Sequence, residues 1–555
     1  MVYTDTYRNT FFVDVLEYFN LTKTCHDMEM ANPCLKTVKG NDYDIEGSDH
    51  ASDSSVDNSG SSSGNENIEI GIGEVKDQPE LVPEEKDPFL VEYSGPDDPE
   101  HPQNWSITKK SIVVAEIMFL TCVTYMGSSI YTPGQEQIQE EFHVGHVVGT
   151  LNLSLYVLGY GLGPIIFSPL SEFAKIGRQQ LYIWTLFGFA MLQIGCATAP
   201  NIVGLIIIRF ITGVLCSPSL ATGGASIGDI ITPEYVPLFI GLWSIGAVAS
   251  PVLGPLVGAS MVVAKNWRYI FWLMLWLSSL TLIVLIFFFP ETSADNILYR
   301  RARRMRKVTG DDRYYTAKAR SEDHLTMKEI ATIALYRPFE IIIKEPIVLA
   351  LDLYIALCYG TFYLFFEAFP IVFVGIYNFT LIETGLAYMG FCVGCVIAYS
   401  LCVVFLAKVV GKQFANGTFT PETFMLLAMA VCWTLPLSLF LFGWAASVHW
   451  IVPIIAEAFF IICVFNLFQA TFAYLAISYP KYLASVFAGN GVCRGGFACA
   501  FPLFGKAMYD NLAIEGYPVA WGSSLLGFFS IGLAIIPFLL YKYGPYLRSK
   551  SSFTG

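Results

Sequence analysis

Twelve stretches of about twenty apolar residues dominate this sequence and restrict it to the membrane. A helix needs roughly 20 apolar residues to cross the hydrocarbon core of a bilayer. Hydrophobic residues make up 54% of the chain and charged residues only 14%, against about 25% charged in a typical soluble domain. This composition excludes a soluble enzyme, a coiled coil, a disulfide-rich secreted domain and a nucleic-acid-binding protein. The predicted spans are 111–131, 147–170, 180–198, 203–225, 236–259, 269–289, 346–368, 384–407, 423–444, 451–476, 482–505 and 520–541.

The spans fall into two groups of six, separated by one long polar segment at 291–344. This segment holds six basic residues between Arg300 and Lys307. Because basic loops stay in the cytoplasm, the central loop is expected inside, and an even number of spans then places both termini inside as well. The predicted fold is an all-α membrane protein with twelve transmembrane helices in two six-helix halves. The expected parts are a tail at 1–105, halves at 106–290 and 345–541, the loop at 291–344 and a cytoplasmic C-terminal tail at 542–555.

The N-terminal tail carries most of the acid in the chain. Residues 1–105 hold 23 of the 46 acidic residues but only 6 of the 33 basic ones, so the membrane body is slightly basic. The region 41–90 is rich in Asp, Glu, Ser, Gly and Asn, and such a segment buries too little apolar surface to fold. The tail is therefore predicted to be disordered. Residues 9–20 are the exception, since their apolar side chains recur at the spacing of a short surface helix.

Two matching groups of six spans are typical of a transporter built from two repeats. A membrane enzyme would need a catalytic cluster. The sequence contains no HExxH, no P-loop, no Gly-x-Ser-x-Gly and no clustered histidines. We therefore expect no enzyme activity, no metal and no cofactor, with transport driven by a proton gradient.

Three segments carry recognisable motifs. The loop after the second span reads Ser168-Pro-Leu-Ser-Glu172-Phe-Ala-Lys-Ile-Gly177-Arg178. A carboxylate at a helix end beside an arginine could latch the two halves at the inner face. The fourth span contains Arg209-x-x-x-Gly213, and a charge within a span is costly enough to be rarely incidental.

The fifth span has the most specific pattern, a series of small residues that favours close approach of a second helix, together with a proline that bends the span. Its members are Gly241, Ser250, Gly254, Pro255, Gly258 and Ala259.

Together these motifs resemble the major facilitator superfamily, and the span 5 pattern resembles the antiporter motif of its drug:proton subfamilies. Trp267-Arg-Tyr-Ile-Phe-Trp272 and Pro290-Glu-Thr292 add a likeness to the fungal 12-span drug:proton antiporters. The resemblance implies a monomeric multi-pass protein of the plasma membrane that exports amphiphilic toxins in exchange for protons. It also implies azole antifungals, benomyl-like fungicides and flucytosine as substrates.

Few ionisable side chains lie within the spans. At about 1.5 Å per residue, Glu116 and Asp352 lie about 9 Å from the inner ends of spans 1 and 7, which are equivalent helices, so both are expected to face one central cavity. A carboxylate in such a place can carry a proton near neutrality. Glu457 is expected to pair with Arg209 or Arg494, because a pair would relieve two buried charges. These five residues are the predicted proton-coupling candidates.

Aromatic residues crowd spans 7 and 10, and an aromatic cavity with scattered amides suits hydrophobic, partly polar molecules better than sugars. Glu367, near the outer end of span 7, is either a gate or an interfacial group. Two alternatives stay open: a proton-coupled transporter of a polyamine or organic acid, which should show more cavity carboxylates, and a transporter-like sensor. The predicted cavity residues are Tyr359, Tyr363, Phe366, Asn466, Gln469 and Asn490.

Overall fold

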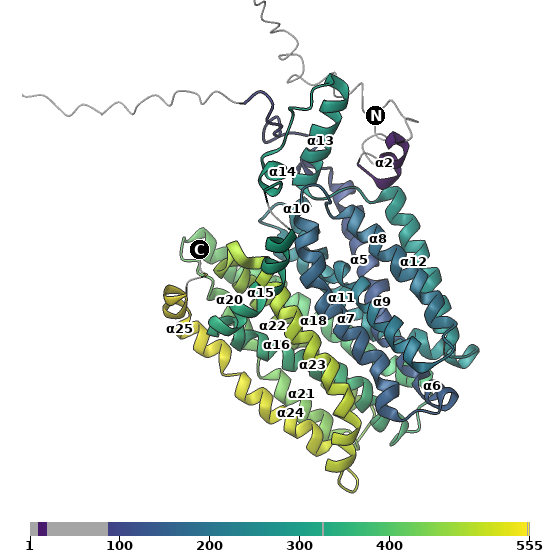
Figure 1. The fold of residues 1–555 in the computed structure, drawn as a ribbon. Coiled ribbons are helices and arrows are strands. Elements are labelled where there is room, and N and C mark those ends of the chain that lie inside the picture. Colours follow the sequence, from purple (N-terminus) through teal and green to yellow (C-terminus); the bar gives the residue numbers. More distant parts are fainter. Residues whose placement is uncertain (1–8, 19–86, 325–326, 552, 554–555) are drawn as a thin grey trace, which may run out of the picture.

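The structure is a computed structural model that describes residues 9–18, 87–324, 327–551 and 553. Helices form a long bundle, and no strand occurs among these described residues, which contain only isolated bridges. Figure 1 shows α2 (Phe11–Tyr18), α13 (Ala294–Thr309) and α14 (Ala317–Glu322) at one end of the bundle, here named the cap end. Helix α6 (Gln135–Phe142) lies at the opposite end, here named the far end.

The first half consists of six long helices that correspond to the first six predicted spans. The fourth of them is followed, after a break at Thr222, by the short helix α10 (Gly223–Ile230), which returns the chain to the cap end. The turn η2 (Thr132–Gly134) precedes α6 at the far end. The long helices are α5 (Ile107–Ser129), α7 (His146–Glu172), α8 (Gln179–Ala197), α9 (Ile202–Ala221), α11 (Val236–Ala264) and α12 (Arg268–Phe288).

The second half is more interrupted, because several of its spans are divided into shorter helical pieces. Span 7 is α16 (Pro346–Phe369), which continues into the π-helical turn η3 (Pro370–Val374). The remaining pieces are α17 (Leu381–Ala387), α18 (Met389–Phe405), η4 (Leu406–Val410), α19 (Gly411–Ala415), α20 (Thr423–Val431), α21 (Thr434–Ala445), α22 (Ile451–Ser478), η5 (Pro480–Tyr482), α23 (Leu483–Leu512), α24 (Ala520–Leu533) and α25 (Ile536–Lys550).

All twelve predicted apolar runs are helical. Eleven helical stretches of the described chain are both long and apolar enough to cross a membrane. Helix α23 takes the place of the eleventh predicted span and is 30 residues long. It carries Asn490, Arg494 and several glycines, which lower its mean hydropathy. The predicted twelve-helix, two-half membrane fold is confirmed.

The two halves pack against each other through α7 with α23 and through α11 with α18. A Cβ atom on Gly161 of α7 would lie only 2.8 Å from the Cα of Gly495 of α23. Nearer the far end, a Cβ on Gly385 of α17 would lie 2.7 Å from the Cα of Leu256 of α11. The halves therefore touch at more than one depth, and glycine permits the contact at both places.

The cap end shows that the tail is not disordered throughout. Asp98, which precedes the turn η1 (Pro102–Asn104), pairs with Arg301 of α13 at 2.8 Å. Helix α2 places Asp14 2.7 Å from Arg300. The prediction of a disordered tail is therefore wrong for 87–105, because charged side chains of this segment find partners on α13 of the central loop. Residues 9–18, the predicted exception, pair with the same helix through Asp14 and pack Phe11 and Phe12 on α8 and α12.

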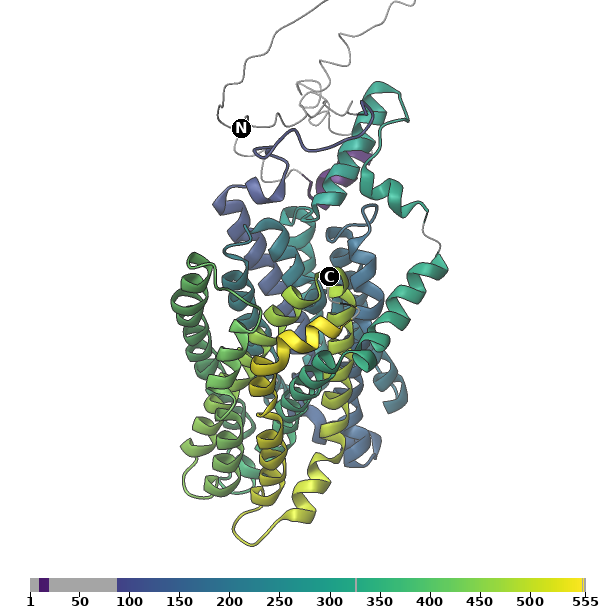
Figure 2. The ribbon, with the colours of Figure 1, turned by 90° about the vertical axis from the view of Figure 1, so that its left-hand side faces the viewer.

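The other expectations for the tail and the central loop have separate outcomes. The short helix expected within 9–20 is confirmed as α2. The disorder expected for 19–86 lies outside the described residues. The loop at 291–344 is largely helical and consists of α13, α14 and α15 (Met327–Lys344); Figure 2 shows α15 running back toward the bundle.

Candidate functional site at the interface between the halves

Four tyrosines join the two halves in the middle of the bundle. Tyr125 and Tyr160 come from α5 and α7, and Tyr359 and Tyr363 come from α16. The hydroxyl of Tyr160 lies 2.6 Å from that of Tyr359 and donates to that of Tyr363 at 3.0 Å, and the hydroxyls of Tyr125 and Tyr359 also contact each other. All four rings are buried. A buried tyrosine hydroxyl needs a partner, and here the partners lie on the opposite half.

The other predicted cavity residues divide between interface and second-half positions. Gln469 of α22 donates to the Ser244 hydroxyl of α11 at 2.9 Å, so it also bridges the halves. Asn466 donates to the Ile462 carbonyl of its own helix at 2.9 Å. Phe366 packs beside Tyr363, with ring centroids 5.6 Å apart. Three predicted residues, Tyr359, Tyr363 and Gln469, thus lie at the interface, and their contact with a substrate stays a prediction.

Asp352 is fully buried in α16 and has one anchored and one free oxygen. Asn490 of α23 donates to its Oδ1 at 2.8 Å, whereas its Oδ2 has no hydrogen-bond partner among the described residues. The guanidinium of Arg494 attracts this carboxylate without a direct ion pair in the described chain. The same guanidinium lies 5.2 Å from the ring centroid of Tyr359. Arg494 therefore connects the buried carboxylate with the tyrosines at the interface.

Arg209 bonds to backbone carbonyls rather than to an acid. Its three nitrogens donate to the carbonyls of Asn152, Gly127 and Ser128 at 3.2, 2.7 and 3.2 Å, and its guanidinium lies 4.4 Å from the ring centroid of Tyr156. These carbonyls belong to α5 and α7, so Arg209 ties three helices of the first half together.

The predicted pairing of Glu457 with Arg209 or Arg494 is wrong. Both carboxylate oxygens of Glu457 are buried without a hydrogen-bond partner in the described chain. The donors of Arg209 are taken up by carbonyls, and Arg494 lies among aromatic rings. Glu116 is similar to Glu457, since it is 7% exposed and neither of its oxygens has a described partner. Glu116 and Asp352 do not bond to each other within the described part of the chain, and their joint access to a cavity stays a prediction.

The small residues of α11 lie against α5 and α18. A Cβ on Gly254 would lie 2.2 Å from the Ser129 Oγ, and one on Gly258 would lie 2.2 Å from the Ile130 carbonyl oxygen. Ser129 also donates to the Pro251 carbonyl at 2.6 Å. Toward the cap end, Gly241 faces the ring of Tyr399 in α18. Three further members of the motif, Ser250, Pro255 and Ala259, are buried in the same helix.

The inner loop does not latch the halves together in the way its sequence predicts. Arg178 pairs with Asp229 of α10 at 3.0 Å, and both residues belong to the first half. Glu172 is exposed and has no ion pair among the described residues. Gly177 has a φ of +71°, and a Cβ there would lie 2.5 Å from the Glu291 Oε2. The prediction that this loop latches the two halves is therefore wrong for this conformation, since the acids that contact Arg178 are Asp229 of α10 and Glu291 just after α12.

Glu291 is a functional candidate that the sequence motifs did not identify as a site residue. Its carboxylate accepts the backbone N–H groups of Arg178 and Gln179 at 3.0 and 3.2 Å and contacts Arg300 at 3.4 Å. It thereby fixes the loop between α7 and α8 to the end of α12. The signal is the carboxylate of Pro290-Glu-Thr292, which resembles the fungal antiporters but for which no contact was predicted.

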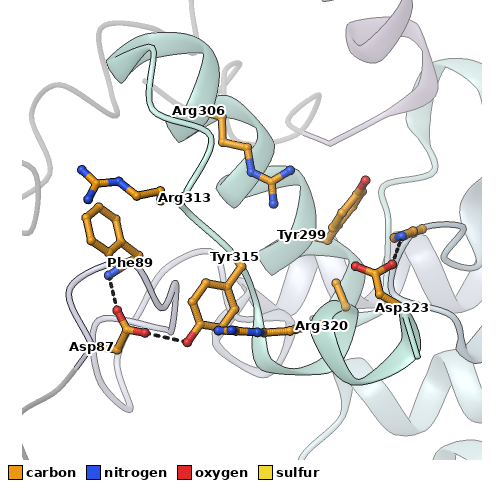
Figure 3. A pocket seen from close by; sticks show the side chains of 10 residues that line it. Asp87, Phe89, Tyr299, Arg306, Arg313, Tyr315, Arg320 and Asp323 are labelled. Atoms are coloured by element: carbon orange, nitrogen blue, oxygen red, sulfur yellow. Dashed lines mark hydrogen bonds and ion pairs between the residues drawn. The ribbon is translucent and has the colours of Figure 1, made fainter. Parts of the chain in front are cut away.

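A cavity of about 490 Å³ lies within the cap, between the segment around Phe89, α13 and α14 (Figure 3). Its cations already have partners. Arg313 stacks 4.0 Å from the ring centroid of Phe89 and pairs with Asp311. Lys175 bonds to Asp323 and holds the pKa of that carboxyl below its ordinary value. The cavity therefore belongs to the ionic packing of the cap against the loop that follows α7.

Comparison with known proteins agrees with this geometry. Residues 117–502 match the Major Facilitator Superfamily. "Fluconazole resistance protein 1" of Saccharomyces cerevisiae is 62% identical over the full length of both chains. "Multidrug transporter FLR2" of Candida glabrata is 65% identical over 85% of this chain and 80% of that protein, and "Cycloheximide resistance protein" of Candida maltosa is 44% identical over 84% and 86%.

Among solved structures, the proton:xylose symporter XylE bound to 6-bromo-6-deoxy-D-glucose superimposes with a TM-score of 0.55, over 79% of this chain and 96% of that one. At 12% identity this likeness shows a shared fold alone. The bundle of two six-helix halves, the span motifs and the close relatives agree. The chain belongs to the major facilitator superfamily of membrane transporters.

Proposed function

We propose that this protein is a proton-coupled multidrug exporter of the plasma membrane. The names of its relatives support fluconazole and cycloheximide as substrates, and we extend the class to other azoles, benomyl-like fungicides and flucytosine. The cap end, with its six clustered basic residues, faces the cytoplasm in this proposal, and so do both termini. The transporter works as a monomer in this proposal. It needs no cofactor, because the proton gradient supplies the energy.

One observation carries the coupling part of the proposal, namely the position of Arg494 between Asp352 and the tyrosines. A drug that separates the tyrosines of α5 and α7 from those of α16 changes the surroundings of the Arg494 guanidinium, which lies 5.2 Å from the Tyr359 ring. The attraction between Arg494 and Asp352 changes with it. Drug and proton can thereby compete through one buried arginine without touching each other.

The chemistry of the interface supports amphiphilic drugs over the alternative substrates. Tyrosines and phenylalanines offer broad apolar faces with single hydroxyl groups, a surface suited to aromatic, partly polar molecules. A polyamine would need several carboxylates at the same place. Beside the interface tyrosines, Asp352 is the carboxylate among the described residues that interacts with Arg494.

The test is transport by inside-out plasma-membrane vesicles, whose lumen corresponds to the cell exterior. An acidic lumen should drive accumulation of labelled fluconazole, and drug addition should release lumenal protons that a pH-sensitive dye reports. A protonophore should abolish both signals. Accumulation of spermidine or an organic acid in place of fluconazole would favour the solute transporter, and the absence of any pH-driven flux would favour the sensor.

A further inference from the structure

One contact between the halves at the far end is built from ionisable side chains. His146, the first residue of α7, places its Nε2 3.2 Å from the Oε2 of Glu367 in α16. Thr150, one turn further along α7, donates to Glu367 Oε1 at 3.2 Å. The Glu367 side chain is 8% exposed and that of His146 is 32% exposed. A buried carboxylate of one half is thus held by an imidazole of the other half that reaches the solvent.

The Nε2 atom of His146 has two competing partners. The side-chain amide nitrogen of Gln135 lies 3.4 Å from it and 3.1 Å from the Thr150 hydroxyl. A neutral imidazole with its proton on Nδ1 can accept from Gln135 at Nε2, but it then has no hydrogen there to donate to Glu367. A protonated imidazole donates at Nε2 and adds a positive charge beside the carboxylate. A neutral imidazole with its proton on Nε2 also donates to Glu367, but only the protonated ring adds a positive charge beside the carboxylate. Protonation therefore strengthens the bond across the interface and ends the bond that Nε2 accepts from Gln135 within the first half.

When protonated, His146 is the cation that contacts Glu367 among the described residues. Lys506 of α23 is next to Gly505, where a Cβ would lie 3.6 Å from the Cβ of Glu367, but Lys506 pairs with Asp510 at 3.2 Å. Arg209 lies 5.7 Å from the ring centroid of Tyr131, which also interacts with Glu367, and its donors are taken up by backbone carbonyls. The other titratable groups on elements packed around the contact are Glu136, Glu140, Glu141 and His143 on or after α6, Glu383 on α17, Tyr388 before α18, His449 before α22 and Glu457 on α22.

We propose that His146 and Glu367 form an extracellular proton latch that closes the far end of the transporter. One proton passes from a hydronium ion in the external medium to the His146 imidazole, and the imidazolium then pairs with the Glu367 carboxylate. The pair draws α7 of the first half onto α16 of the second. Both are positioning residues, since they set which side of the transporter is open. The inference rests on the proposed orientation and proton-coupled export.

The direction of the effect follows from the charges. The latch needs a protonated His146 and an ionised Glu367, so it holds when the external medium is acidic enough to protonate the imidazole and loosens as the external pH rises. Closing of the far end on protonation from outside is compatible with the transport cycle of an exporter. After drug leaves to the outside, proton uptake closes the far end and returns the empty transporter toward the cytoplasmic side.

The test measures how readily the far end opens. Ser154 lies one turn beyond Thr150 on the same face of α7, is fully buried, and its hydroxyl has no described hydrogen-bond partner. In a Ser154→Cys protein, a membrane-impermeant maleimide added from outside should react only when the far end opens. The pH is set equal on both sides and no drug is present. We expect labelling about fivefold faster or more at about pH 8 than at about pH 5.5.

Four variants in the Ser154→Cys background decide the outcome. His146→Gln and Glu367→Gln should label fast at both pH values, because neither can form the ion pair. His146→Arg keeps its charge at both pH values and should label slowly at both. His143→Asn removes an exposed histidine of the same loop and should keep the parental pH profile. The protein without Ser154→Cys gives the background from its own cysteines.

The latch is overturned if parental labelling does not depend on pH, or if His146→Gln keeps the parental profile. It is also overturned if His146→Arg labels as fast as His146→Gln, since charge would then not matter. None of these readings requires drug or a proton gradient. A protein with an intact latch profile that fails to accumulate drug in vesicles would instead refute the proposed function.

Discussion

Asn490 of α23 donates its side-chain amide to Oδ1 of Asp352 in α16 at 2.8 Å and leaves Oδ2 without a partner among the described residues. The anchored oxygen fixes the side chain, and the free oxygen is available for a proton. A carboxylate held in this way can gain and lose a proton without losing its position.

Replacing this carboxylate should separate proton coupling from drug binding. Asp352→Asn keeps the volume of the side chain and removes its titratable proton. We expect it to abolish drug accumulation driven by an imposed pH difference while drug binding and drug-for-drug exchange persist. Glu116→Gln should have a smaller effect, because Glu116 has no described bond to the second half. Drug uptake into inside-out vesicles measures both.

Asp510→Asn is the matched control for these variants. Asp510 is half-exposed on α23, pairs only with Lys506 among its described neighbours, and should be replaced without loss of accumulation. Undiminished pH-driven accumulation in Asp352→Asn, in Glu116→Gln and in the double variant would show that the proton travels elsewhere. Glu457, with two unbonded buried oxygens, would then be tested next.

Arg209 should be needed for the assembly of the first half as well as for transport. Each of its three hydrogen bonds joins a charged donor to a carbonyl, and one such bond contributes about 1.5–3 kcal/mol. Arg209→Ala should lower the thermal midpoint in detergent and abolish resistance. Arg209→Lys should retain part of both, because an ammonium group cannot reach three carbonyls in the planar geometry of a guanidinium. Wild-type midpoint and transport in Arg209→Ala would contradict this role.

The glycines of α11 should tolerate no side chain. A Cβ at Gly258 would lie 2.2 Å from the Ile130 carbonyl oxygen, a backbone atom that cannot rotate away. We expect Gly258→Ala and Gly254→Leu to lose drug resistance while the protein still reaches the membrane, as surface labelling can check. Gly496→Ala is the control, since a Cβ there meets nothing within 4 Å. Full resistance in Gly258→Ala at normal surface level would argue against the close α5–α11 contact.

The sequence predicts the membrane fold well because each span can be recognised from its own apolar composition, without knowledge of its neighbours in space. Helix α23 lies where the eleventh apolar run predicts it, even though Asn490 and Arg494 dilute its hydropathy. The partners of charged residues were not predictable in the same way. Glu457 was expected to pair with Arg209 or Arg494. Arg209 instead donates to the carbonyls of Gly127, Ser128 and Asn152, which only the packing of α5 and α7 brings within reach.

The prediction of disorder at the cap end was wrong for a related reason. Composition favours disorder for an acidic tail, but it does not report that Asp98 and Asp14 meet Arg301 and Arg300 more than 200 residues away. In the inner loop, the sequence likewise identified Arg178 as a residue that forms an ion pair, but its partner is Asp229 and not Glu172. Long-range pairs of this kind depend on helix ends meeting in space, and spacing along the chain does not encode them.

Tyr359 should influence which drugs are exported rather than whether the protein folds. Tyr359→Phe keeps the aromatic ring near Arg494 and removes the hydroxyl that contacts Tyr160 and Tyr125. A drug that bonds to this hydroxyl should lose affinity by about 1–3 kcal/mol, because its polar group is left unpaired, whereas an apolar drug should be exported as before. The measurement is the inhibitory concentration of a panel of antifungals for cells that express each variant. Tyr269→Phe, at an exposed position in the first turn of α12, serves as the control. An equal shift for every drug would mean that Tyr359 acts only on the stability of the interface.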